Sequence, residues 1–195
     1  MPSVNTRATR RTLGRLPGDA DIWVFVLGDM LIFSAYFAAY LFAGRMGDRE
    51  LFLRSQQQLS QNLGFCNTLI LLTSSLFIAL CVQAARLGNF AVASRFLELG
   101  GGCGVVFLLL KAFEWHSKIA RGLTISTNAF FMHYYVMTGV HAAHILIGLT
   151  FLMIIRRELR DATTPRMQLI ESGGIYWHMV DFLWFMIFSL LYLMR

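Results

Sequence analysis

Residues 128–155 read NAFFMHYYVMTGVHAAHILIGLTFLMII and contain no Asp, Glu, Lys or Arg. An uncharged, apolar run of about 18 residues or more is long enough to cross the hydrocarbon core of a bilayer. The apolar residues follow one another without the alternation of a barrel strand, so the run predicts a helix. This stretch therefore indicates an integral membrane protein.

Four further apolar runs with few charges bring the predicted number of transmembrane helices to five. They cover residues 22–43, 63–85, 96–115 and 174–194. Of the 195 residues 56% are hydrophobic and only 14% charged, whereas about a quarter are charged in soluble domains. The segments between the runs are too short for a soluble domain, and the polar stretch 55–58 is expected to be a loop. We predict an all-α membrane protein with a basic tail over residues 1–21 and one five-helix membrane domain over residues 22–195.

The distribution of positive charge predicts the orientation of the chain. If the N-terminus lies inside, ten of the 17 Lys and Arg residues lie on the inner side. Four are in the tail, and six are in the second and fourth loops, namely Arg86, Arg95, Arg156, Arg157, Arg160 and Arg166. This excess favours an N-terminus inside and a C-terminus outside, with the first run as an uncleaved signal anchor. The net charge of +6 is thus explained by the Lys and Arg residues that set the orientation of the chain in the membrane, and there is no basic domain to bind nucleic acid.

Ionisable side chains inside the predicted helices are the candidates for function, because an Asp, Lys or Arg near the bilayer centre costs about 2.5–3.5 kcal/mol on insertion scales. They are Asp29, Glu114, His133, His141, His144, His178 and Asp181. At a rise of about 1.5 Å per residue, Asp29 and Asp181 lie about 10 Å, and His144 about 16 Å, from the inner ends of their helices. We expect Asp29 to pair with a histidine, whereas Glu114 and Lys111 fall at the outer end of the third helix.

Three interpretations of these residues are possible. His141 and His144, like His178 and Asp181, are three residues apart and share a helix face. They could form a hydrogen-bonded network that locks helices together, a proton relay or transport path, or a metal site. Five histidines are few for a metal-dependent membrane enzyme, and the three cysteines form no C-x-x-C pair. We favour the network, and we predict no catalytic residue and no metal ligand.

Five motifs occur in an order that is more specific than any one of them. They are WVFVLGDMLIFSAYF at 23–37, NTLILLTS at 67–74, KAFEW at 111–115, TGVHAAHILIG at 138–148 and YWHMVDFLW at 176–184. The last two resemble the T-G-x-H-x-x-H-x-x-x-G and Y-W-H-x-V-D-x-x-W signatures of subunit III of the haem–copper respiratory oxidases. The other three resemble helices of the same subunit, so the resemblance covers nearly the whole chain.

The resemblance implies the five-helix bundle of subunit III, without the two extra N-terminal helices of longer members. It implies an accessory subunit of a bacterial inner membrane that has no haem or copper of its own, sits against a catalytic haem-bearing subunit, holds phospholipid and supports proton uptake. Asp29 stands where many members have a buried glutamate. Arg156 and Arg157 occupy the position of an arginine near lipid phosphates. The buried polar network would comprise Asp29, Asn67, Glu114, His141, His144, His178 and Asp181.

The type of oxidase is a finer question. Residues 55–59, 67–75 and 83–86 look most like the short NorE type, which is associated with bacterial nitric oxide reductase. The alternative within the family is a subunit of a cytochrome c or quinol oxidase. A rival from another class is a stand-alone proton channel or transporter that uses Asp29 and the intramembrane histidines.

Overall fold

The structure, a computed structural model, describes residues 18–47, 49–161 and 165–194, so most of the predicted basic tail lies outside the described residues. Its elements are α1 (Ala20–Met46), α2 (Arg49–Gln57), α3 (Gln61–Arg86), α4 (Phe90–Ala120), α5 (Ala129–Asp161), α6 (Met167–Phe188) and a π-helical turn over Ser189–Leu193. Five of these helices, all except the short α2, are long and apolar enough to cross a membrane. The predicted all-α architecture with five transmembrane helices is confirmed for the described residues.

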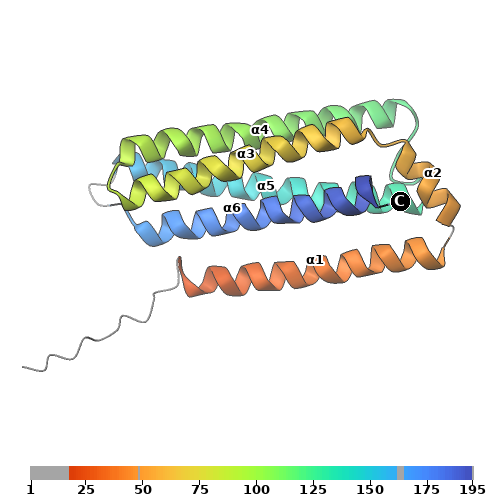
Figure 1. The fold of residues 1–195 in the computed structure, drawn as a ribbon, viewed down its shortest axis with the longest axis horizontal. Helices are drawn as coiled ribbons and strands as arrows, with labels where there is room; N and C mark the ends of the chain where they lie inside the picture. Colours follow the sequence, from red (N-terminus) through yellow and green to blue (C-terminus); the bar gives the residue numbers. More distant parts are fainter. Residues whose placement is uncertain (1–17, 48, 162–164, 195) are drawn as a thin grey trace, which may run out of the picture.

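Helices α3, α4, α5 and α6 form a four-helix bundle, as Figure 1 shows. Each packs against two others, with α3 and α5 on either side of α6 and with α4 diagonal to it. Helix α1 lies outside this bundle, alongside α6, and α2 connects it to α3 at the far end. Among the five spans, α6 is the most buried and α1 the least. The molecule is thus a tight bundle with one loosely attached outer helix.

Trp177 is the side chain around which the bundle packs. It lies on α6 and is 1% exposed, and its indole Nε1 donates to Ser74 Oγ of α3 at 3.0 Å. A Cβ atom added to Gly104 of α4 would lie 2.8 Å from the indole ring, and one added to Gly148 of α5 would lie 3.0 Å from it. The two glycines therefore leave the space that the indole fills, and Trp177 contacts all three other helices of the bundle.

We expect Gly104→Ala to destabilise the bundle by about 1–3 kcal/mol, because the new methyl group overlaps a rigid ring that cannot turn aside. Gly102→Ala is the matched control, since it lies on the same helix and its added Cβ has nothing within 4 Å. That change should be neutral or stabilising, because alanine favours a helix over glycine by about 1 kcal/mol. Thermal unfolding in detergent, followed by circular dichroism, measures both. Equal melting temperatures for the two variants would contradict the packing described for Trp177.

Several basic residues that were predicted in loops are helical. Arg95 lies in α4, and Arg156, Arg157 and Arg160 lie in the last turns of α5. The prediction placed the helix ends where the apolar runs end, but ion pairs across neighbouring helices let the helices continue. Glu98 of α4 accepts from both Arg156 and Arg160 at 2.8 Å.

Helix α6 also extends beyond its apolar run, at its start, where Glu171 of α6 lies 2.9 Å from Arg86 of α3. Helix α6 begins at Met167, seven residues before the predicted start at residue 174. Asp181 is therefore fourteen residues from the beginning of its helix, or about 21 Å, instead of the predicted 10 Å. This places its carboxylate near the middle of the span.

The polar stretch 55–58 was expected to be a loop, and this prediction was wrong for its first three residues. They belong to the short helix α2, whose Arg54 and Glu50 form an ion pair one turn apart. Ser55 is buried and accepts from Asn128 Nδ2 at 2.9 Å, and Gln56 Nε2 donates to the backbone oxygen of Met194 at 2.5 Å. Ser55 and Gln56 belong to a helix because their side chains have partners at Asn128, just before α5, and at Met194.

Candidate functional site

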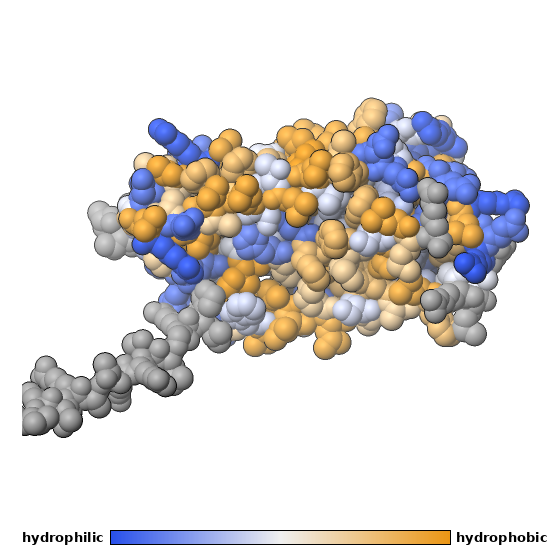
Figure 2. All heavy atoms as spheres, viewed as in Figure 1, coloured by the Kyte–Doolittle hydropathy of each residue, from blue (hydrophilic) through white to orange (hydrophobic). Residues whose placement is uncertain are grey.

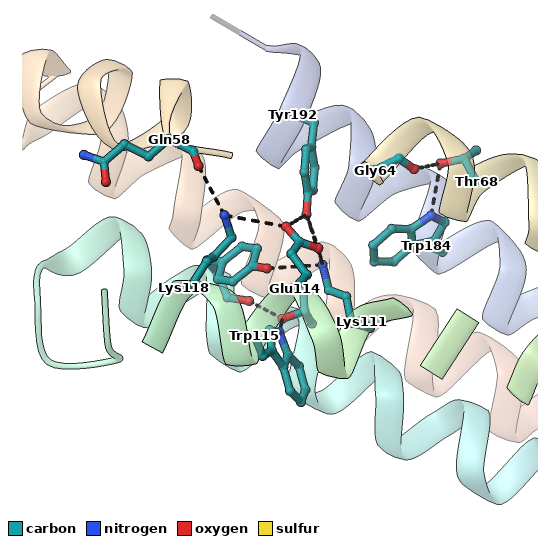
Figure 3. A network of polar contacts seen from close by, with 11 residues as sticks. Gln58, Gly64, Thr68, Lys111, Glu114, Trp115, Lys118, Trp184 and Tyr192 are labelled. Carbon is teal, nitrogen blue, oxygen red and sulfur yellow. Dashed lines mark hydrogen bonds and ion pairs between the residues drawn. The ribbon is translucent and has the colours of Figure 1, made fainter. Parts of the chain in front are cut away.

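The largest buried polar cluster surrounds Glu114 on α4 (Figure 3). Lys111 Nζ donates to Glu114 Oε2 at 2.8 Å, and Lys118 Nζ lies 3.7 Å from Glu114 Oε1. Tyr192 OH donates to Glu114 Oε1 at 2.9 Å. Lys111 and Glu114 are only 1% and 2% exposed. The cluster thus holds two cations and one anion away from lipid and water.

Aromatic rings surround the ammonium group of Lys111. It donates to the hydroxyl groups of Tyr192 at 3.0 Å and Tyr134 at 3.3 Å. It also lies 5.0 Å from the centre of the Trp184 ring, close enough for a cation–π contact. These contacts come from α5, α6 and the turn after α6, so one lysine of α4 binds side chains of three segments.

Lys118 extends the cluster to α2. Its ammonium donates to the backbone oxygen of Gln58, just after the last residue of α2, at 3.2 Å. A cation at the carboxyl end of a helix meets carbonyl groups that lack helical partners. Lys111 and Glu114 were predicted at the outer end of the third helix, but α4 continues to Ala120 and both side chains are buried inside the bundle. The cluster thus connects α4 to α5, to α6 and the turn after it, and to the residue after α2.

Asp29 is the first predicted site residue that the structure pairs as expected. Its Oδ1 lies 3.2 Å from Nε2 of His144, which joins α1 to α5, while its Oδ2 has no hydrogen-bond partner among the described residues. His144 Nδ1 lies 2.8 Å from the backbone oxygen of Val140. About two turns further along α1, Tyr36 OH lies 3.0 Å from His133 Nδ1 of α5. Two histidines of α5 therefore bind α1.

We expect Asp29→Leu to loosen α1, because leucine cannot accept a hydrogen bond from His144. The loss should be about 1 kcal/mol, the usual contribution of one hydrogen bond. Hydrogen exchange measured by mass spectrometry should become about fivefold faster in α1 and stay unchanged in α3. Asp29→Asn keeps an acceptor oxygen and should change exchange less. Equal exchange in α1 of the leucine variant and the unaltered chain would show that the pair does not hold this helix.

His141 and His144 were predicted to share a face, but they do not form one site. Residues three apart on a helix differ by about 60° around its axis, and each histidine meets a different neighbour. The His141 ring is fully buried, 5.5 Å from the Phe107 ring and 5.2 Å from the Trp184 ring. Neither of its nitrogens has a hydrogen-bond partner among the described residues, and the same holds for the buried amide of Asn67.

The second predicted pair, His178 and Asp181, lies on α6 beside Ser75 of α3. Ser75 Oγ is 2.6 Å from His178 Nδ1. Asp181 is 9% exposed, and neither of its carboxylate oxygens has a hydrogen-bond partner among the described residues, although the Ser75 hydroxyl lies nearby. Among residues 18–47, 49–161 and 165–194, no three His, Cys, Asp or Glu side chains gather as metal ligands do.

Of the two predicted lipid residues, Arg156 lies at one end of a groove between α4 and α5. The apolar lining of this groove comes from residues including Leu97, Leu149 and Met153, and its volume is about 390 Å³. Arg157 lies outside the groove, in a neighbouring pocket that it shares with Met153, Arg156 and Arg160. Arg156 is held by Glu98, whereas exposed Arg157 has no ion pair among the described residues. An apolar groove beside a cluster of arginines suits an acyl chain attached to a phosphate.

Comparison with known proteins identifies relatives over the whole described bundle. The family described as "Cytochrome c oxidase subunit III" matches residues 19–195. "Cytochrome c oxidase subunit 3" of Alkalihalophilus pseudofirmus is 29% identical over 100% of this chain and 93% of its own length. "Cytochrome bo(3) ubiquinol oxidase subunit 3" of Buchnera aphidicola subsp. Schizaphis graminum is 29% identical over 88% of this chain and 91% of its own. "Heme-copper oxidase subunit I+III" of Aeropyrum pernix is 29% identical over 88% of this chain and 22% of its own.

Proposed function

Because the chain belongs to the cytochrome c oxidase subunit III family, we propose that it is an accessory membrane subunit of a haem–copper oxidase or nitric oxide reductase complex, with no redox centre of its own. The observation that carries this proposal is the family match, which runs from residue 19 to residue 195 and includes all five membrane-spanning helices. Its relatives are subunit III of oxidases that use either cytochrome c or ubiquinol.

The partner in this proposal is the catalytic, haem-bearing subunit. Homologous subunits III assemble with catalytic oxidase subunits. The name of the Aeropyrum pernix relative joins subunits I and III, and this chain matches only about a fifth of that protein. A protein that carries both subunits in one polypeptide supports direct contact between them.

Within the family we propose the short type that accompanies nitric oxide reductase, on the sequence of residues 55–59, 67–75 and 83–86. We place the N-terminus on the inner side of a bacterial inner membrane. In the described chain, the ends of α3 and α5 and the starts of α4 and α6 meet at the end of the bundle where α1 begins. This end carries Arg86, Arg95, Arg156, Arg157, Arg160 and Arg166, as the positive-inside rule requires of an inner face.

Two further roles belong to the same proposal. A phospholipid would place its phosphate in the pocket lined by Arg156, Arg157 and Arg160, and an acyl chain in the adjoining groove between α4 and α5. The Asp29–His144 pair would support proton uptake by the catalytic subunit, because Asp29 Oδ2 has no hydrogen-bond partner among the described residues and is free to take a proton. Neither role needs a metal or a redox cofactor on this chain.

Affinity purification of the tagged chain from its own membranes in a mild detergent tests the proposal. We expect a haem-bearing subunit to co-purify at about one copy per chain, and mass spectrometry of that subunit decides between an oxidase and nitric oxide reductase. Another tagged multi-pass protein from the same membranes is the control. If the chain purifies alone, the proposal is contradicted. Proton flux through liposomes that contain only this chain, abolished by Asp29→Asn, would then favour a stand-alone proton channel.

A further inference from the structure

Two arginines at the end of the bundle where α1 begins differ from the other arginines there. In Figure 2 hydrophilic residues gather at this end and at the opposite end, with mostly hydrophobic residues between them. Four of the arginines pair with carboxylates, namely Arg86 with Glu171, Arg166 with Glu158, and Arg156 and Arg160 with Glu98. Arg95 of α4 and Arg157 of α5 are exposed and have no ion pair among the described residues. Two guanidinium groups are thus available to bind an anion.

Each of these two arginines lines a pocket between α4 and α5 or beside them. The first pocket has a volume of about 300 Å³ and is lined by Met153, Arg156, Arg157 and Arg160. The second has a volume of about 450 Å³, and its lining includes Phe90, Arg95, Glu98, Leu159 and Arg160. Because Arg160 lines both, the two pockets are neighbours.

The apolar groove between α4 and α5 adjoins both pockets. It shares Met153 and Arg156 with the first pocket and Glu98 with the second. Leu149, which lines the groove, is twelve residues before the end of α5, or about 18 Å. The groove therefore runs from the level of the arginines into the depth that acyl chains occupy.

The charge of the two pockets favours more than one phosphate. Together they are lined by four arginines, Arg95, Arg156, Arg157 and Arg160, and by one carboxylate, that of Glu98, which leaves a net charge of +3. Glu98 Oε1 accepts from both Arg156 and Arg160, so it does not reach the two unpaired arginines as a partner. A single phosphodiester carries one negative charge and could fill only one of the two pockets.

We propose that the phospholipid of this site is an anionic lipid with two phosphates in one head group. One phosphate binds Arg157 in the first pocket, the other binds Arg95 in the second, and an acyl chain enters the groove. Guanidinium groups donate paired hydrogen bonds to phosphate oxygens, and basic pockets beside membrane helices suit such head groups. The inference rests on the proposed phospholipid role, and it adds the class of lipid and the second phosphate site.

Lipid titration of the purified full-length chain tests the class of lipid. The chain is washed free of lipid in detergent, and its melting temperature is followed against tetraoleoyl cardiolipin, which has two phosphates. Dioleoylphosphatidylglycerol at twice the concentration supplies the same number of phosphates and acyl chains. We expect cardiolipin to bind with a Kd at least tenfold lower. Inorganic phosphate is the control without acyl chains, and it should give no saturable shift.

The outcomes separate this inference from the phospholipid role on which it rests. Equal affinity per phosphate for the two lipids would overturn the inference, although a phospholipid with one phosphate would still bind. No saturable shift with either lipid would overturn the phospholipid role and the inference together. Saturation by inorganic phosphate at the same concentration as cardiolipin would show that the pockets bind free anions and not a lipid.

Substitutions test the location of the two phosphates. Arg95→Gln and Arg157→Gln should each weaken cardiolipin binding about tenfold, because each leaves one phosphate without its arginine. Gly101→Leu, which places a side chain in the groove, should weaken binding of both lipids. Arg121→Gln is the matched control, since Arg121 is exposed just after α4 at the opposite end of the bundle. Unchanged cardiolipin affinity in Arg95→Gln would show that the second pocket holds no phosphate.

Discussion

Glu114→Leu is expected to be the most damaging single change in the chain, with a loss of about 3–5 kcal/mol. Glu114 is the only anion within reach of Lys111 and Lys118 among the described residues, and both lysines are buried. Leucine would leave two positive charges unpaired in the interior of the bundle. A loss of this size is a large fraction of the 5–15 kcal/mol that typically stabilises a folded domain.

Unfolding in detergent and the yield of folded protein measure this effect. Lys111→Met should cost less, because Glu114 then keeps Lys118 and the Tyr192 hydroxyl as partners. The double variant Lys111→Met with Glu114→Leu should recover much of the loss, since replacing a buried ion pair by apolar groups is often close to neutral. If Glu114→Leu melts at the temperature of the unaltered chain, the cluster does not hold the bundle together.

Trp177→Ala is the second large effect, expected at about 3–5 kcal/mol, which is usual for deletion of a large buried aromatic side chain. The indole touches α3, α4 and α5 at once, so its removal opens a cavity that no single neighbour can fill. The glycines at 104 and 148 have no side chains that could move into the space.

Trp177→Phe separates packing from hydrogen bonding. Phenylalanine keeps most of the ring but loses the hydrogen bond that the indole donates to Ser74. The loss of stability should therefore be about 1 kcal/mol for the hydrogen bond, with a further small loss from the smaller cavity. Both variants can be followed by thermal unfolding in detergent. Equal losses for alanine and phenylalanine would mean that the hydrogen bond, and not the fit against the two glycines, makes Trp177 important.

The spans were predictable from the sequence because a bilayer core demands long uncharged runs, and such runs stand out in a chain of 195 residues. Helix ends were less predictable. The pairing of Glu98 with Arg156 and Arg160 carries α5 past its apolar run, and this depends on residues about 60 positions apart in the chain. For the same reason α2 was expected to be a loop, since its partners lie at Asn128, just before α5, and at Met194.

The candidate site was predictable in part. The pairing of Asp29 with a histidine follows from the cost of leaving either group alone in a membrane, and the structure confirms it with His144. Lys118 could also have been found, because residues 111, 114 and 118 recur at helical spacing on one face of α4. Tyr192 could not, because its contact with Glu114 spans 78 positions and depends on how α6 packs.

We propose that this chain is a subunit without a redox centre, and the partition of haem between the chain and its partner shows whether it carries one. The complex would be purified through a tag on this chain, the chain would be separated from the haem-bearing subunit by a stronger detergent, and a visible spectrum would be recorded for each fraction. We predict that all the haem absorbance follows the partner and that the separated chain shows no Soret band. A stoichiometric haem spectrum in the chain's own fraction would show that the chain has a redox centre of its own.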